Sequence, residues 1–248
     1  MKENNKEKLY DLFEISDILH NRFSHEELEK KMESGEIKGE KIEDQWYAKK
    51  EVIDAFREEL TQKTIFFTER HHIDLTKVQL NERILDIGGG GEGIIGLFAG
   101  EHVIAIDPSE RELKEAPGDC LKIIMDAKDM KFLNESFDTI TVFFTMMYIN
   151  LMAHEQVFKE IYRVLKPKGE LFIWDLNIPK KKIEEEKDIY AVRLEVDIGS
   201  KKVESGYGTK WDKGVDMTHY LNLGESVGLK IMEKQINGET FFLKFRKD

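Results

Sequence analysis

The sequence predicts an α/β protein: a doubly wound, mostly parallel seven-stranded sheet with an antiparallel C-terminal hairpin, preceded by a small, mainly helical domain. Three observations support this fold class. From residue 82 onward, short apolar runs alternate with amphipathic helical segments, which is typical of a parallel sheet covered by helices on both faces. Before residue 80 the apolar residues recur mostly at helix spacing. Near the C-terminus, two apolar segments flank Asn237–Gly238, a strong hairpin turn signal.

The composition allows a sizeable core and excludes several classes of protein. Apolar residues make up 40% and aromatic residues 10% of the 248 residues, as in globular proteins. Cys120 is the single cysteine, so no internal disulfide forms and a reducing compartment fits. The first residues lack the apolar core of a signal peptide, and no apolar run is long enough to span a bilayer. We therefore expect a cytoplasmic protein without a membrane partner.

Residues 1–72 are expected to form the small N-terminal domain. A first helix is predicted from four apolar residues at helix spacing: Leu9, Leu12, Ile15 and Leu19. A second helix starts with the capping-box pair Ser24 and Glu27 and ends at Gly35. Residues 36–51 read as a short hairpin or wing. A third helix follows, with one apolar face made of Val52, Ile53, Phe56 and Leu60.

Residues 73–248 are expected to form the large domain with the parallel sheet. Five strands are predicted from short apolar runs: Arg83–Ile87, His102–Ile106, Leu121–Met125, Thr139–Phe144 and Glu170–Asp175. Three amphipathic helices lie between them: Glu92–Ala99, Glu110–Ala116 and Glu155–Leu165. Residues 178–217 interrupt this alternation and include a hairpin that turns at Gly199–Ser200. We expect this insertion to cover the pocket for a substrate.

The stretch "RILDIGGGGEG", Arg83 to Gly93, is the first indication of a ligand site. It ends the first strand of the sheet and opens a helix, where glycines let the backbone pass close to a ligand. A P-loop is excluded, because no Gly-Lys-Ser/Thr follows. The spacing of Gly88, Gly90 and Gly93 fits a dinucleotide site. The acidic neighbours Asp86 and Glu92 instead favour a cationic ligand over a pyrophosphate.

Two further carboxylates follow the next two strands. Asp107 ends the second strand, 21 residues after Asp86, where a carboxylate can accept both hydroxyls of a ribose. Asp126 ends the third strand, and "VFKEIYRVLKPKGELFIWD" then supplies a helix, a Lys-Pro-x-Gly turn and the fifth strand. This ordered series closely resembles the Rossmann-like class I S-adenosylmethionine-dependent methyltransferases. The resemblance covers about residues 82–175 and extends to the final hairpin.

The resemblance implies S-adenosyl-L-methionine as the cofactor and a set of residues that hold it. The glycine loop would lie under the methionine part, Asp107 on the ribose, and Asp126 with Ala127 beside the adenine. The phenylalanines after the fourth strand would line the sulfonium side, and since a strand alternates faces, one of the two is expected to face the site. The full set of cofactor-binding residues is Asp86, Gly88, Gly89, Gly90, Asp107, Pro108, Asp126, Ala127, Phe143 and Phe144.

Some features fall outside this resemblance. Glu92 holds the last glycine position of the family's common Asp-x-Gly-x-Gly-x-Gly form, and Gly93 follows one residue later. Four aromatic residues could shape a substrate pocket or pack in the core: Tyr148, Trp174, Tyr207 and Trp211. His71 and His72 lack the spacing of a metal site, and no metal is expected. No signature identifies a catalytic residue or the methyl acceptor.

The N-terminal residues resemble the small winged helix-turn-helix domains of the MerR and excisionase type. The likeness rests on a second helix ending in Ser-Gly-Glu-Ile, a wing ending in Trp-Tyr and a closing helix. Such domains insert the second helix into the DNA major groove. Here that helix carries Glu26, Glu27 and Glu29, and the chain has a net charge of −11, which disfavours a polyanionic partner. Protein contact, homodimerisation or substrate gating is the favoured role.

Three functions therefore follow from the sequence. The first is methyl transfer from S-adenosylmethionine to a small molecule or a protein side chain. The second is a DNA-binding regulator in which a methyltransferase-fold domain senses the cofactor. The third, a dinucleotide-dependent enzyme, is disfavoured by the acidic surroundings of the glycine loop.

Overall fold

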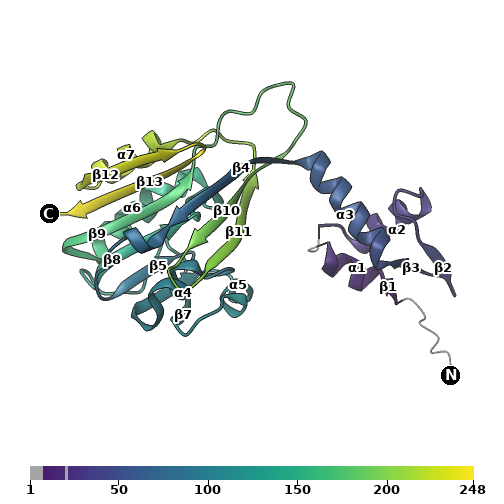
Figure 1. The fold of residues 1–248 in the computed structure, drawn as a ribbon, viewed down its shortest axis with the longest axis horizontal. Helices are drawn as coiled ribbons and strands as arrows, with labels where there is room; N and C mark the ends of the chain where they lie inside the picture. The colour runs from purple at the N-terminus through teal and green to yellow at the C-terminus, as the bar shows by residue number, and fades with distance from the viewer. Residues whose placement is uncertain (1–7, 20–21) are drawn as a thin grey trace. The chain divides into compact units, whose positions relative to one another are not determined.

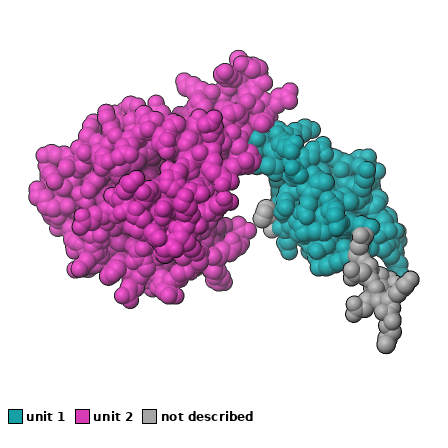
Figure 2. Space-filling view, viewed as in Figure 1, with its two compact units in different colours: residues 1–65 teal, residues 66–248 magenta. Residues whose placement is uncertain are grey.

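The computed structural model describes residues 8–19 and 22–248, which divide into two compact units. Unit 1 comprises residues 1–65 and unit 2 residues 66–248 (Figure 2). The two units are described separately below. Among the described residues, no helix is both long and apolar enough to cross a membrane.

The described residues of unit 1 form three helices and a small antiparallel sheet with the strand order β1-β3-β2. Its elements are β1 Leu9–Asp11, α1 Leu12–Ile18, α2 His25–Glu33, β2 Glu40–Ile42, β3 Gln45–Lys49 and α3 Lys50–Thr64. The predicted capping box of α2 is present, because Ser24 and Glu27 cap each other's backbone amides. The predicted wing is a hairpin that turns at Glu43 and Asp44, both with positive φ. Leu9 lies in β1 and not in the first helix, which corrects one expectation. The winged helix-turn-helix assignment itself stays a prediction.

Unit 2 is built on the predicted seven-stranded sheet, with the strand order β12-β13-β9-β8-β5-β6-β7 (Figure 1). The strands are β5 Ile84–Ile87, β6 Val103–Asp107, β7 Leu121–Ile124, β8 Phe137–Phe143, β9 Leu165–Leu176, β12 Leu229–Asn237 and β13 Thr240–Lys247. Strands β5 to β9 are parallel, and β13 runs antiparallel to β9 and to β12. The C-terminal hairpin turns at Gly238, as predicted.

The helices of unit 2 connect these strands. The α-helices are α4 Ile94–Ala99, α5 Glu110–Glu115, α6 His154–Val164 and α7 Met217–Ser226. The short 3-10 helices are η1 Leu75–Lys77, η2 Gly100–His102, η3 Met146–Tyr148 and η4 Leu151–Ala153. The predicted helices agree with α4, α5 and α6 to within two residues at each end.

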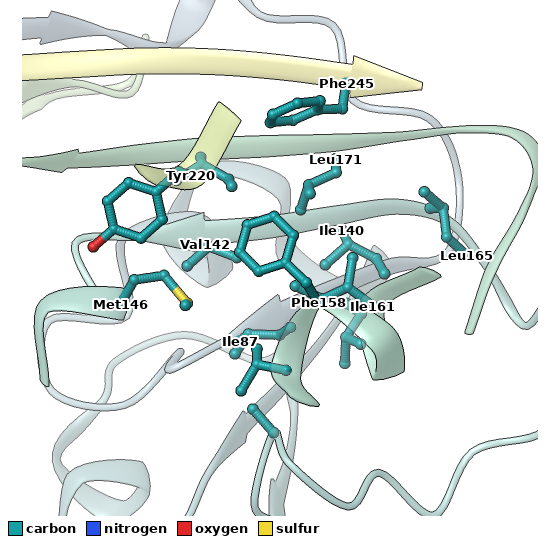
Figure 3. Close-up of a cluster of buried hydrophobic side chains, with 14 of the residues drawn as sticks. Ile87, Ile140, Val142, Met146, Phe158, Ile161, Leu165, Leu171, Tyr220 and Phe245 are labelled. Carbon is teal, nitrogen blue, oxygen red and sulfur yellow. The ribbon is translucent and has the colours of Figure 1, made fainter. Parts of the chain in front are cut away.

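A hydrophobic core lies on each face of the large sheet. Figure 3 shows one of them, in which Phe158 of α6 and Tyr220 of α7 pack among strand residues such as Val142. In β9, Leu171 belongs to this core and the next residue, Phe172, to the core on the opposite face. Both faces are therefore buried, which explains why these strands are continuous apolar runs.

A second, three-stranded sheet packs on the opposite face of the large sheet. It has the order β11-β10-β4 and consists of β4 Ile65–Asp74, β10 Ile189–Asp197 and β11 Lys202–Lys210. The β10–β11 hairpin is the one predicted within residues 178–217, whereas β4 was not predicted. His71 in β4 is buried, and its Nε2 lies 2.9 Å from a carboxylate oxygen of Glu239.

Candidate functional site

A cavity of about 520 Å³ lies at the carboxyl ends of strands β5, β6, β7 and β8. We call it the glycine-loop cavity. In open α/β sheets this edge is where ligands bind, and the volume is that of a small-molecule site. The structure brings together all ten residues predicted from the sequence, because each of them lines this cavity: Asp86, Gly88, Gly89, Gly90, Asp107, Pro108, Asp126, Ala127, Phe143 and Phe144.

The glycine loop is held tightly by the protein itself. The amides of Gly88 and Gly89 both donate to the carbonyl of Ile106, at 2.8 and 3.2 Å. Gly88 has a φ of 75°, and a Cβ there would overlap the side chain of Thr145. A Cβ at Gly90 would lie 2.6 Å from Cβ of Glu112. These glycines are therefore required by the packing of the loop as well as by any ligand, which the sequence alone did not indicate.

Asp86 lies at the end of β5 and is buried. Its Oδ1 accepts a hydrogen bond of 2.7 Å from the hydroxyl of Thr141 in β8. Burial raises the pKa of Asp86 to about 7, with a smaller contribution from the charge of Asp107, while the bond from Thr141 lowers it. A cation bound in the cavity would favour the ionised carboxylate.

Two further carboxylates of the cavity lining, Asp107 and Asp126, stand at the ends of β6 and β7. Oδ1 of Asp107 accepts a 2.8 Å bond from the amide of Ser109, and burial raises the pKa of this carboxyl group. Asp126 is exposed and accepts a 2.9 Å bond from the amide of Lys128. Both residues line the cavity, and the ribose and adenine roles that the resemblance implies for them stay predictions.

Phe143 and Phe144 both line the cavity, contrary to the expectation that one of them faces it. Strand β8 ends at Phe143, and Phe144 has a left-handed φ of 49°. The alternation of faces applies only within a strand, so the turn at Phe144 brings the second ring to the same side. A non-glycine residue in this conformation is uncommon and is often found at functional sites.

Tyr148 and Tyr207, which the sequence analysis named as residues that could shape a substrate pocket or pack in the core, line the cavity on the side of Phe144. Tyr207 of β11 stacks on Phe144, with ring centroids 5.1 Å apart and an interplanar angle of 6°. The hydroxyl of Tyr148, after β8, accepts a 3.2 Å bond from the amide of Gly208. We call the part of the cavity walled by Phe144, Tyr148 and Tyr207 its aromatic end. The remaining lining residues that were not predicted are Ile87, Gly91, Glu92, Gly93, Ile94, Ile95, Ile106, Glu112, Met125, Thr145, Ile149 and Gly206.

Two of the four aromatic residues singled out in the sequence lie elsewhere. Trp174 is buried in the core beside Phe143, with ring centroids 5.6 Å apart. Trp211 is buried, and its indole N–H donates to the carbonyl of Pro179 at 2.8 Å. Both tryptophans belong to the hydrophobic core, whereas Tyr148 and Tyr207 line the cavity.

The glycine-loop cavity is acidic. Of the residues that line it, all within the described part of the chain, five are Asp or Glu and none is Lys, Arg or His: Asp86, Glu92, Asp107, Glu112 and Asp126. Such a lining attracts cations and repels a pyrophosphate. S-adenosylmethionine is a cation that also carries a ribose and a base, so the acidic wall and Asp107 fit it better than they fit a dinucleotide.

Comparisons with known proteins agree with this fit. Residues 85–173 match the family described as "Methyltransferase domain". A demethylmenaquinone methyltransferase of Clavibacter sepedonicus is 36% identical over 106 residues, which are 40% of this chain and 42% of that protein. A ubiquinone/menaquinone biosynthesis C-methyltransferase UbiE of Proteus mirabilis is 26% identical over 125 residues, 45% of this chain and 49% of that protein. The chain thus spans less than half the length of these two relatives.

Solved structures share the fold. A SAM-dependent methyltransferase of Methanosarcina mazei has a TM-score of 0.50 at 17% identity and covers 69% of this chain and 95% of its own. A Pyrococcus horikoshii protein has a TM-score of 0.53 at 16% identity, with 70% and 86% of the two chains covered. Residues 85–173 are thus similar to the methyltransferase domain family, and unit 2 shares the fold of a SAM-dependent methyltransferase, which supports S-adenosylmethionine as the cofactor.

Proposed function

We propose that this protein transfers a methyl group from S-adenosylmethionine to a small, planar, mainly apolar acceptor that carries a hydroxyl or amine group. One observation carries the proposal: the cavity continues from the glycine loop to an aromatic end, where Phe144 and Tyr207 stack and Tyr148 forms the adjoining wall. Flat aromatic walls favour planar ligands through stacking. The names of the curated relatives, which refer to demethylmenaquinone and to ubiquinone/menaquinone biosynthesis, support a quinone-like acceptor.

The cofactor would occupy the part of the cavity between the glycine loop and the ends of β6 and β7. Asp107 would accept the ribose hydroxyls, with Pro108 beside it, and Asp126 and Ala127 would flank the adenine. The loop Gly88–Gly90 would lie under the methionine part, and buried Asp86 would balance its positive charge. The bound cofactor supplies a methyl group on a sulfonium, so the protein's task is to align the acceptor with it.

The insertion within residues 178–217 would cover the acceptor. Its strand β11 contributes Gly206 and Tyr207 to the cavity lining. The hydroxyl of Thr209 donates a 3.0 Å bond to the carbonyl of Met147, which fixes β11 beside the turn that carries Tyr148. This support favours a small molecule over a protein side chain as the acceptor, because the hairpin narrows the aromatic end.

Unit 1 would serve as a protein-contact or homodimerisation domain of the winged helix-turn-helix type. The two lysines in the last turn of α2 are both neutralised by glutamates: Lys30 pairs with Glu26 and Lys31 with Glu36, each at 2.7 Å. A helix without free cations is poorly suited to phosphate contacts.

Titration calorimetry with S-adenosylhomocysteine tests the cofactor assignment. We expect binding by the full chain and a loss of about 10- to 100-fold in affinity for Asp107→Asn, because a hydrogen bond to a charged group contributes about 1.5–3 kcal/mol. Asp119→Asn, which alters an exposed carboxylate outside the cavity lining, is the matched control. No heat at millimolar ligand would refute the cofactor assignment. Transfer of labelled methyl groups to 1,4-dihydroxynaphthalene then tests the acceptor class, and transfer to protein substrates alone would contradict it.

A further inference from the structure

Four of the five carboxylates in the glycine-loop cavity are already engaged by the protein. Asp86 accepts a bond from Thr141, and Asp107 accepts one from Ser109. In each of these two carboxylates, one oxygen is therefore held in a fixed position by the protein.

The other two engaged carboxylates pair with cations. Glu112 forms an ion pair of 2.7 Å with Arg111, and Asp126 lies 3.2 Å from the ammonium group of Lys128. Their charge is therefore balanced before any ligand binds.

Glu92 is the exception. It lines the cavity, is partly exposed, and forms no hydrogen bond or ion pair with any residue in the described part of the chain. It stands between Gly91 and Gly93, whose φ values of 59° and 53° are both left-handed. The chain thus turns sharply on both sides of one acidic residue that has no partner among the described residues.

The charge of Glu92 acts on the aromatic end of the cavity. Burial raises the pKa of Tyr148 to about 12, and the negative charge of Glu92 adds to this effect. For Tyr207, burial is again the main cause of a raised pKa, and the charge of Glu92 is the second. Glu92 lines the same cavity as Tyr148 and Tyr207, so its carboxylate shares this space with the aromatic end where the acceptor would bind.

We infer that Glu92 is the catalytic base of methyl transfer and that the acceptor carries a weakly acidic hydroxyl or amine group facing it. This inference rests on the function proposed above. As the acceptor's oxygen, nitrogen or ring carbon forms its bond to the methyl carbon, the methyl–sulfur bond breaks and its electron pair stays on sulfur. The acceptor then loses one proton, which a carboxylate oxygen of Glu92 takes up. Charge balances, because the sulfonium and the carboxylate both become neutral.

The two tyrosines of the aromatic end are unsuited to accept the proton. The hydroxyl of Tyr148 accepts a bond from Gly208, and with a pKa of about 12 it stays protonated near neutral pH. The hydroxyl of Tyr207, whose pKa is also raised, stays protonated as well. A positioned general base typically accelerates a reaction by about 10²- to 10⁴-fold.

The test compares Glu92→Gln and Glu92→Asp with the wild type, and Glu101→Gln as a control that alters an exposed glutamate outside the cavity lining. Calorimetry with both S-adenosylmethionine and S-adenosylhomocysteine gives a readout that needs no acceptor. We expect Glu92→Gln to bind S-adenosylhomocysteine within about threefold of the wild type. Its preference for the cationic cofactor should fall about fivefold, the order expected for removing one partly screened charge.

Single-turnover methylation of 1,4-dihydroxynaphthalene is the second readout. We expect Glu92→Gln to slow it by about 10²-fold or more, Glu92→Asp to restore part of the rate, and the control to match the wild type. An unchanged cofactor preference in Glu92→Gln overturns the inference whether or not this probe is methylated, and so does an unchanged rate. If the wild type itself does not bind S-adenosylhomocysteine, the proposed function fails, and this inference fails with it.

Discussion

The ring of Phe144 stacks on the ring of Tyr207 at 5.1 Å with an interplanar angle of 6°, although 63 residues separate them in the chain. This contact joins the end of β8 to the β10–β11 hairpin at the aromatic end of the glycine-loop cavity. Phe143 makes an edge contact to the same tyrosine at 6.1 Å. These ring contacts hold the hairpin over the cavity. Loss of the Tyr207 ring should therefore weaken binding of the acceptor more than binding of the cofactor.

Substitution of Tyr207 tests this division. Tyr207→Ala should raise the KM for a methyl acceptor such as 1,4-dihydroxynaphthalene by about tenfold. This factor corresponds to about 1.4 kcal/mol, which is the size of the contribution of one aromatic pair. Tyr207→Phe keeps the stack and should retain the wild-type KM. Steady-state kinetics with calorimetry of S-adenosylhomocysteine separates the two ligands. A larger loss of affinity for S-adenosylhomocysteine than for the acceptor would contradict the proposal that the aromatic end binds the acceptor.

The buried carboxylate of Asp86 should make stability depend on pH. Its pKa is about 7 in the folded protein because of burial and about 3.9 when unfolded. At a pH well below 4 the carboxyl group is protonated in both states; as the pH rises towards 7, the unfolded chain releases the proton first. The free energy of unfolding therefore decreases over this range, by up to about 4 kcal/mol at about 1.4 kcal/mol per pKa unit.

Asp86→Asn removes this dependence, because the amide does not titrate. Chemical denaturation at several pH values between 4 and 7 should show a smaller decrease in the variant than in the wild type. Part of the decrease should remain, since burial also raises the pKa of Asp175 to about 7. Asp119→Asn, at an exposed position, should behave as the wild type. An equal slope in Asp86→Asn would show that Asp86 does not bind the proton.

Gly88 should tolerate no side chain. Gly88→Ala combines a left-handed φ of 75° with overlap onto Thr145. A left-handed residue costs about 1–2 kcal/mol and overpacking about 1–3 kcal/mol, so we expect a loss of about 2–5 kcal/mol in urea denaturation. Gly118→Ala is the control, because φ is also positive, at 95°, and no atom lies closer than 3.6 Å to a Cβ built there. Equal losses in the two variants would mean that the contact with Thr145 adds nothing.

The sequence predicted the elements whose signals are local. The strands that precede Asp86, Asp107 and Asp126 are apolar runs because both faces of the sheet are buried. Their carboxyl ends meet at one edge, and the resemblance to the methyltransferase family supplied the other residues of the predicted set that line the cavity. The turn at Asn237–Gly238 was predicted from its residue types alone.

The elements that were missed depend on contacts far along the chain. In β4, Arg70 pairs with Glu204 and His72 with Glu195, so a charged segment becomes a strand through partners more than 100 residues away. The position of Tyr207 in the cavity likewise depends on how β11 packs. The left-handed turn at Phe144 had no signal in its residue type, since this conformation is unusual for phenylalanine.

Unit 1 should not bind DNA. The helix that resembles a recognition helix exposes Glu26 and Glu33, and both of its lysines are paired with glutamates. We expect no retardation of duplex DNA by the full chain in gel shifts at about 50 mM salt, where even non-specific binders with phosphate contacts associate. A variant that combines Glu26→Lys and Glu33→Lys is the matched positive control and should gain salt-sensitive binding. Salt-sensitive retardation by the wild type would instead support the regulator hypothesis and contradict the protein-contact role.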